Sequence, residues 1–130
     1  MANRKKVAAD ARKAAKANQY VATLNNNPTS PRKTRLVVDL IRGKKVDEAL
    51  NILKFHKKES AGKLEKLLLS AINNWEQKTG LNPADHELFV STAFVEAGTT
   101  IKRFLPAPQG RANRIRKRSN HVTLEVKTKA

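Results

Sequence analysis

The feature that most constrains this chain is a stretch of 26 residues, from Glu96 to His121, that has no helical periodicity. Strand-like segments flank it on both sides: β-branched and aromatic residues are enriched from 88 to 95, and Val122, Leu124 and Val126 alternate with polar residues. Two structures fit this arrangement. One is a long disordered loop, which is uncommon within a compact domain. The other is an antiparallel hairpin that extends beyond the body of the protein.

The alternation on the two sides favours the hairpin, with its turn centred on Ala107. Pro106, Pro108 and Gly110 cluster at this tip, where proline does not interrupt a central ladder. We predict a hairpin over about residues 94–120, with an arm of about 40 Å at roughly 3.3 Å per residue. A bulge would shift its register by one or two residues. The predicted pairs are Leu88 with Val126, Val90 with Leu124, Thr92 with Val122 and, further out, Glu96 with Arg118.

Charge is distributed unevenly along the 130 residues, whose net charge is +16. Residues 1–38 hold nine basic residues and one acid, residues 39–96 hold nine of each, and residues 97–130 again hold nine basic residues and one acid. The excess therefore lies at the two ends of the chain. This asymmetry favours a polyanionic partner, with nucleic acid as the leading candidate, over an ordinary solvated surface. Beyond Glu96 the hairpin carries only basic charges, so it needs an anionic support.

Helical periodicity predicts three helices between residues 31 and 79. Ser30-Pro31 is typical of an N-cap followed by proline at the first helical position, which begins a helix over 31–42 before Gly43. A second helix starts at Val46 and ends near Phe55 or His56, and a third ends at Gly80. Their apolar stripes are Leu36, Val37, Leu40 and Ile41; Val46, Ala49, Leu50 and Leu53; and Ala61, Leu64, Leu67, Leu68, Ala71, Ile72 and Trp75, the last expected in the core.

The N-terminal segment is rich in alanine, lysine and arginine over residues 4–19. It predicts either a loose helix or a segment that is disordered until it meets an anion, and we favour a helix in the bound state. Asn25-Asn26-Asn27-Pro28 ends any such helix. The sequence therefore predicts a basic extension over 1–28 and a single domain over 29–130.

Several classes of function lack support in the sequence. A run of about 18 apolar residues and the apolar region of a secretory signal are both absent, so we expect no membrane partner. The chain has no cysteine, and His56, His86 and His121 lack metal-ligand spacing. The glycines are isolated, and no nucleophile-elbow pattern occurs. We therefore expect no catalytic residue, no metal, no cofactor and no enzymatic activity.

Basic side chains at the ends of the first predicted helix and along the hairpin are the candidate binding residues. Since Phe104 is the only aromatic residue near the tip, a platform that stacks single strands is disfavoured, and a reader of folded RNA or a binder of duplex backbone is favoured. The alternative is a DNA-architectural protein with a proline-tipped arm, which would need two arms in a dimer. We expect no homo-oligomer. The candidates are Arg32, Lys33, Arg35, Arg42, Lys44, Lys45, Lys102, Arg103, Arg111, Arg114, Arg116, Lys117, Arg118 and His121.

Three stretches of the chain resemble one protein family. They are TSPRKTRLVVDLIRGKKVDEALNIL, LEKLLLSAINNW and IKRFLPAPQGRANRIRKRSNHVTLEV, which together cover about residues 29–126. They are similar to the signatures of the universal large-subunit ribosomal protein numbered twenty-two, of the bacterial type. The resemblance implies an α+β fold, with three helices packed on a small antiparallel sheet and a long protruding β-hairpin.

The family's function is implied in the same way. A member is a structural constituent of the large subunit in the cytoplasm, binds 23S ribosomal RNA, contacts neighbouring ribosomal proteins and aids assembly. Its hairpin lines the peptide exit tunnel, so the tip would meet the nascent peptide. Here the tip is Pro106, Ala107, Pro108, Gln109, Gly110 and Arg111.

The chain departs from the family pattern in two places. Ala107 and Gln109 stand where the family usually has basic residues, and Pro108 replaces a small residue, so this tip is less cationic and stiffer. Residues 1–24 extend beyond the common bacterial form. We expect this extension to lie on ribosomal RNA.

Overall fold

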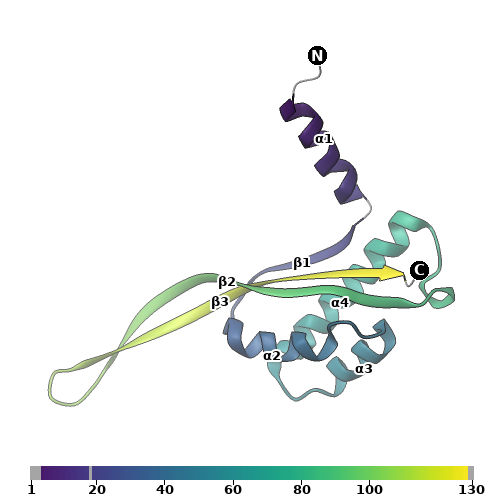
Figure 1. Ribbon diagram of the computed structural model, residues 1–130. Coiled ribbons are helices and arrows are strands. Elements are labelled where there is room, and N and C mark those ends of the chain that lie inside the picture. The colour runs from purple at the N-terminus through teal and green to yellow at the C-terminus, as the bar shows by residue number, and fades with distance from the viewer. Residues whose placement is uncertain (1–3, 18, 129–130) are drawn as a thin grey trace.

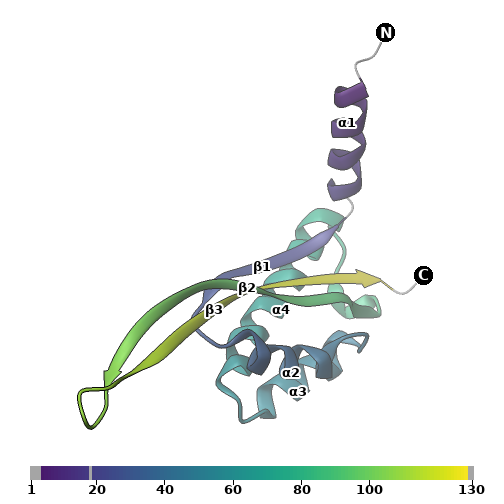
Figure 2. The ribbon, with the colours of Figure 1, turned by 60° about the vertical axis from the view of Figure 1, so that its left-hand side comes forward.

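The computed structural model describes residues 4–17 and 19–128, which form helices, a three-stranded antiparallel sheet and a long hairpin (Figure 1). The sheet order is β1-β3-β2, and α2, α3 and α4 cover one face of it, so the predicted α+β class is confirmed. The hairpin and α1 leave the body at different ends (Figure 2). The elements are α1 Arg4–Ala17, β1 Tyr20–Asn27, α2 Pro31–Ile41, α3 Val46–Phe55, α4 Glu59–Thr79, a 3₁₀ turn Pro83–Asp85, β2 Leu88–Pro106 and β3 Ala112–Thr128.

The three helices of the body lie where the sequence predicts them. Proline occupies the first turn of α2 after Ser30, and α4 ends at Gly80, whose φ of 69° is the left-handed conformation that glycine adopts at helix ends. The buried face of α2 differs from the prediction, because Leu36 and Leu40 are exposed. A second stripe with the same helical spacing is buried in their place. Its first member is polar, so the spacing of apolar residues does not include it. This stripe is Thr34, Val37, Val38 and Ile41.

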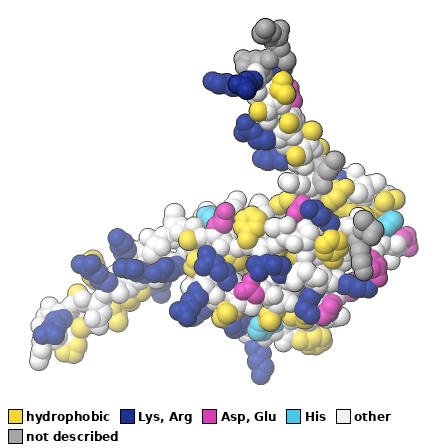
Figure 3. Space-filling model, in the orientation of Figure 1, with side chains coloured by type: hydrophobic (Ala, Val, Ile, Leu, Met, Phe, Trp, Pro, Cys, Tyr) yellow, Lys and Arg dark blue, Asp and Glu magenta, His cyan; other side chains and the backbone are white. Residues whose placement is uncertain are grey.

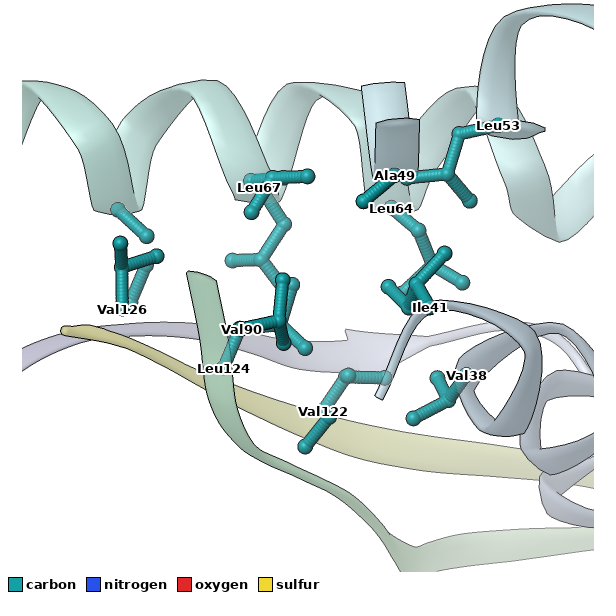
Figure 4. Close-up of a cluster of buried hydrophobic side chains, with 14 of the residues drawn as sticks. Val38, Ile41, Ala49, Leu53, Leu64, Leu67, Val90, Val122, Leu124 and Val126 are labelled. Atoms are coloured by element: carbon teal, nitrogen blue, oxygen red, sulfur yellow. The ribbon is translucent and has the colours of Figure 1, made fainter. Parts of the chain in front are cut away.

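The core lies between the sheet and its helices. Alternate residues of β3 line the core on the side of the sheet, and α4 contributes the largest share of the core residues on the side of the helices (Figure 4). Trp75 on α4 is 1% exposed and has edge-to-face contacts with Tyr20 and His86, which confirms its predicted place in the core. The residues that β3 contributes are Val122, Leu124 and Val126, each fully buried.

The strand β1 is not predicted from the sequence, because the whole of this segment falls within the expected N-terminal extension. Residues 20–27 instead pair with β3 over the core, with Ala22 opposite Leu124. The segment is short and follows an alanine-rich helix, so its alternation is weak. Contacts with α4 hold its outer edge: Asn74 Nδ2 donates to Val21 O at 3.1 Å, and Lys78 Nζ donates to Gln19 O at 2.7 Å.

The hairpin exists, but its predicted register is wrong. Val90 pairs with Val126, Val95 with Val122 and Glu96 with His121, and the last pair before the turn is Pro106 with Ala112. The turn is therefore centred on Gln109, two residues beyond the prediction, and β2 contains two bulges. At the first bulge, the hydroxyls of Ser91 and Thr92 both donate to Glu125 Oε2, at 3.2 and 2.9 Å.

This bulge also reverses which residues of β2 are buried. Two residues of β2 oppose one of β3 there, so the inward positions change parity. Ala93 and Val95 are consequently buried, whereas Thr92, predicted to face the core, is exposed, and Phe94 is 41% exposed.

Candidate nucleic-acid interface

The hairpin beyond the body is lined with basic side chains (Figure 3). All seven are exposed, and within the described part of the chain no acidic side chain forms an ion pair with any of them. Their charge is therefore available to an external anion. The seven residues are Lys102, Arg103, Arg111, Arg114, Arg116, Lys117 and Arg118.

The register divides the hairpin into two unlike faces, because residues paired across an antiparallel ladder point to the same side. Lys102 pairs with Arg116, between Thr100 opposite Arg118 and Phe104 opposite Arg114. One face thus gathers four basic residues, termed here the basic row: Lys102, Arg114, Arg116 and Arg118. The other face alternates basic and aliphatic residues, with Ile101 opposite Lys117 and Arg103 opposite Ile115.

The basic row continues the core-facing side of β3. Both bulges insert their extra residue into β2, so β3 keeps a single alternation along its 17 residues. Its even-numbered residues are first apolar and buried in the body, from Val126 to Val122, and then basic and exposed, from Arg118 to Arg114. The alternation that packs the core therefore also sets the direction of three arginines.

The tip is a loop over residues 107–111 that follows the last ladder pair. Ala107 N donates to Arg111 O at 2.8 Å, which closes the loop. Gln109 has a φ of 60° and Gly110 has a φ of 70°. This left-handed conformation favours glycine, which is the residue at position 110. Pro108, Gln109 and Arg111 are exposed, and arginine is the only charged residue of the loop.

The predicted basic residues of α2 fall into two groups. Arg32 and Lys33 are exposed, and no acid among the described residues pairs with them. Arg35 and Arg42 instead use their guanidinium groups on the outer edge of β2. The Nε and Nη2 atoms of Arg35 donate to Val95 O at 3.2 and 3.0 Å, and those of Arg42 donate to Ala93 O at 3.0 and 2.7 Å. These two residues protect an edge strand, which would otherwise offer free carbonyl groups.

The lysines after α2 are paired with acids. Lys44 forms an ion pair with Glu48, and Lys45 Nζ lies 2.6 Å from Glu87 Oε1. The hydrogen bond from Lys45 to Glu87, together with its charge, raises the pKa of this lysine. Both pairs are exposed, so a polyanion would compete with the acids for the two lysines.

His121 lies inside β3, opposite Glu96, where the hairpin leaves the body. Its Nδ1 accepts a hydrogen bond from Asn26 N at 3.1 Å, and the side chain is half-buried. The ring therefore has one nitrogen engaged in the fold.

The helix α1 contains none of the predicted binding residues, yet it presents a second basic surface. At 100° per residue, five basic residues share one side of it, with alanines and Val7 on the other (Figure 3). None of the 14 described residues of this helix is buried. We term this side the α1 basic face: Lys5, Lys6, Arg12, Lys13 and Lys16. Helical spacing within the segment is the signal that would have found it.

The structure also bears on metal ions and membranes. Within residues 4–17 and 19–128, no three His, Asp or Glu side chains lie close enough together to hold a metal ion. No helix in the described part of the chain is long and apolar enough to cross a membrane.

Comparison with known proteins identifies the family. The family model described as ribosomal protein L22p/L17e matches residues 22–127. Large ribosomal subunit protein uL22 of Flavobacterium johnsoniae is 62% identical over 125 residues, which cover 95% of this chain and 91% of the relative. That of Bacteroides fragilis is 58% identical over 130 residues, which cover 100% of this chain and 96% of the relative.

The second of these alignments includes α1, so this relative has a counterpart of the N-terminal extension even though the family model begins later. Both relatives are named as proteins of the large ribosomal subunit. The chain belongs to the L22p/L17e family of ribosomal proteins, as a bacterial-type large-subunit protein without enzymatic activity.

Proposed function

We propose that this chain binds 23S-type ribosomal RNA through its two basic arms, that it aids assembly of the large subunit, and that its hairpin tip lines the peptide exit tunnel. The observation that carries the proposal is the basic row, in which four exposed cations share one face of an extended ribbon and face no acid of the described chain. An isolated ribbon of two strands is at best marginally stable in water. Surrounding phosphates would neutralise it and hold it in place.

Phosphate contacts suit the residues of this row. Lysine and arginine release condensed counterions when they bind phosphates, so affinity falls as salt rises. Three of the four residues in the basic row are arginines. An arginine side chain can bind a phosphate with two parallel hydrogen bonds and can stack on exposed bases. The spacing of the row is set by the rigid ladder, so it would read the shape of a folded RNA rather than its base sequence. Arg32 and Lys33 on α2, with His121, would extend this contact towards the body.

The tip carries the part of the proposal that concerns the tunnel. Because Arg111 is its only charged residue, the nascent peptide and the tunnel wall would meet a largely neutral loop. Neighbouring ribosomal proteins would contact the exposed surface of the body, in which residues 39–96 hold nine basic and nine acidic residues. The α1 basic face would bind ribosomal RNA at a second place, at the other end of β1.

A binding competition tests the proposal. The labelled full chain is mixed with a fragment of large-subunit ribosomal RNA at moderate salt, and unlabelled duplex DNA of equal length is added. At equal concentrations of the two nucleic acids, we expect most of the chain to remain bound to the RNA, because the fit of the hairpin to folded RNA adds to non-specific charge attraction. Preference for the duplex DNA would overturn the ribosomal proposal and support the DNA-architectural alternative.

A further inference from the structure

The hairpin leaves the body beside a small cluster of polar side chains that are bonded to one another. We term this cluster the hairpin root: Asn27 at the end of β1, Thr29 in the following turn, Thr34 on α2 and Asn120 on β3. Asn120 and Thr34 are fully buried, and Asn27 is 3% exposed. Burial of amide groups in this way is unfavourable unless they are hydrogen-bonded.

Asn120 is the centre of the network. Its Nδ2 lies 2.7 Å from Thr29 O, 2.9 Å from Thr29 Oγ1 and 3.1 Å from Thr34 Oγ1, and donates to them. Its Oδ1 accepts from Asn27 Nδ2 at 3.3 Å, and the same nitrogen donates to Thr29 Oγ1 at 2.8 Å. A single side chain of β3 thus ties together β1, the start of α2 and the turn between them.

The position of Asn120 makes this amide informative. It takes the next inward place of β3 after Val126, Leu124 and Val122, where an apolar side chain would extend the core. Apolar contacts fill space, but they do not select one orientation, whereas hydrogen bonds to fixed oxygen atoms do. The amide stands between the last core residue and Arg118, the first residue of the basic row.

Both neighbours of β3 become irregular at this same level. The register of β1 shifts between Leu24 and Asn27, and that of β2 shifts between Ala97 and Thr100. Within the second shift, Gly98 approaches β3 closely: an added Cβ would lie 2.6 Å from Ser119 Oγ and 3.2 Å from the backbone carbon of Ser119. Ser119 Oγ in turn donates to Thr99 O at 2.7 Å. Since the ladders on both sides of β3 are interrupted there, regular pairing alone does not fix the direction of the hairpin.

We propose that the hairpin root is a lock that fixes the direction in which the hairpin leaves the body, with Asn120 as its positioning residue. A ribbon joined to the body through irregular pairing would swing about this level. The bonds of Asn120 to β1, the turn and α2 prevent that motion, so the basic row is presented in one orientation. Its value for binding rests on the proposed function: a pre-oriented arm loses less conformational entropy when it meets its RNA.

Distance measurements on the free protein test the lock. The natural chain has no cysteine, so Lys66→Cys on α4 and Ala112→Cys near the tip accept one spin label each, both at exposed positions. Pulsed electron double resonance then gives the distribution of distances between body and hairpin. For the parent chain we expect one narrow distribution.

Asn120→Asp is the main variant, because it keeps the shape of the side chain and replaces the donating nitrogen with an oxygen. The carboxylate would face Thr29 O and Thr34 Oγ1. Since it has no hydrogen to donate to Thr29 O, we expect the distance distribution to become at least twofold wider. Asn113→Asp, which makes the same change at an exposed position of the hairpin, is the control and should leave the width unchanged.

Thr34→Val is the second variant, since it removes one acceptor of the network at constant shape. It should widen the distribution less than Asn120→Asp, and it decides the outcome alone if Asn120→Asp fails to fold. Circular dichroism and Trp75 fluorescence report whether the body is intact. A broad distribution in the parent chain, or parental width in folded variants, would overturn the proposal. Because no RNA is present, this result is independent of whether the chain binds ribosomal RNA.

Discussion

At the scale of single residues, arginines that look alike in the sequence differ in what they contact. All three nitrogen atoms of the Arg42 guanidinium are engaged, because Nε and Nη2 donate to Ala93 O and Nη1 lies 2.8 Å from Asp39 Oδ1. Arg32, on the same helix, is exposed and has no ion-pair partner among the described residues. Arg42 therefore belongs mainly to the fold, and Arg32 is available for phosphate.

A pair of substitutions separates these two tasks. Arg42→Met removes the bonds to β2 and should lower the free energy of unfolding by about 1 kcal/mol, the usual net value of such bonds at a solvated site. Arg32→Met should leave stability within about 0.5 kcal/mol of the parent chain. It should instead reduce the slope of log affinity against log salt for ribosomal RNA by about one unit.

Urea unfolding and RNA binding at several salt concentrations measure the two effects. The assignment fails if Arg42→Met changes the salt slope more than Arg32→Met does. It also fails if the unfolding free energies of the two variants are equal.

At the scale of secondary-structure elements, the sequence predicts what depends on local pattern. The helices α2, α3 and α4 lie within a residue or two of their predicted ends, because proline, glycine and apolar spacing act locally. The inward parity of β3 is also as predicted. The bulge at Ser91 is not predictable in the same way, since it depends on the side chain of Glu125, which is distant in the sequence.

The strand β1 and the sorting of the basic residues share that difficulty. Tyr20–Asn27 is a strand because β3 offers it an edge and α4 holds its other side. Arg35 and Arg42 are bound to β2 by contacts across 60 and 51 residues of sequence. Spacing identified the basic residues of the candidate interface, whereas tertiary structure decides which of them face outward.

The basic row is the element on which binding should depend most. Arg114→Ala, Arg116→Ala and Arg118→Ala combined should reduce the salt slope by up to about three units, if each arginine contacts one phosphate. The body should remain folded, because the three residues lie beyond the core. Lys57→Ala, Lys58→Ala and Lys66→Ala combined make the same change in charge on the body and should alter the slope much less. A loss of helical circular dichroism in the arginine variant would contradict this division.

The helix α1 is the second such element. A helix of 14 residues that buries no side chain is marginal in water, and its first turn carries Arg4, Lys5 and Lys6 at the end where positive charge is unfavourable. Deletion of residues 2–17, which spares β1, should therefore leave the stability of the body almost unchanged while lowering RNA affinity and the salt slope. Unchanged affinity and slope would show that α1 does not contact the RNA.

At the scale of the whole molecule, a body whose residues 39–96 carry no net charge lies between two cationic arms. The strand β1 connects them, since it starts beside α1 and ends at the hairpin root (Figures 1 and 2). The arms extend from opposite ends of this strand, so together they reach further than the body alone. The central claim is that these arms provide most of the chain's attachment to the RNA of the large subunit, and that Arg32 and Lys33 of α2 add to it.

Sedimentation of the cellular protein tests this claim most directly. The tagged full chain and a variant with alanine at Lys5, Arg12, Lys16, Arg114, Arg116 and Arg118 are expressed separately, and the extracts are separated on a gradient at low magnesium. We expect the full chain in the fractions of the large ribosomal particle and the variant, with its body folded, at the top of the gradient. Equal incorporation of both chains into the large particle, or a full chain found only at the top, would contradict the account.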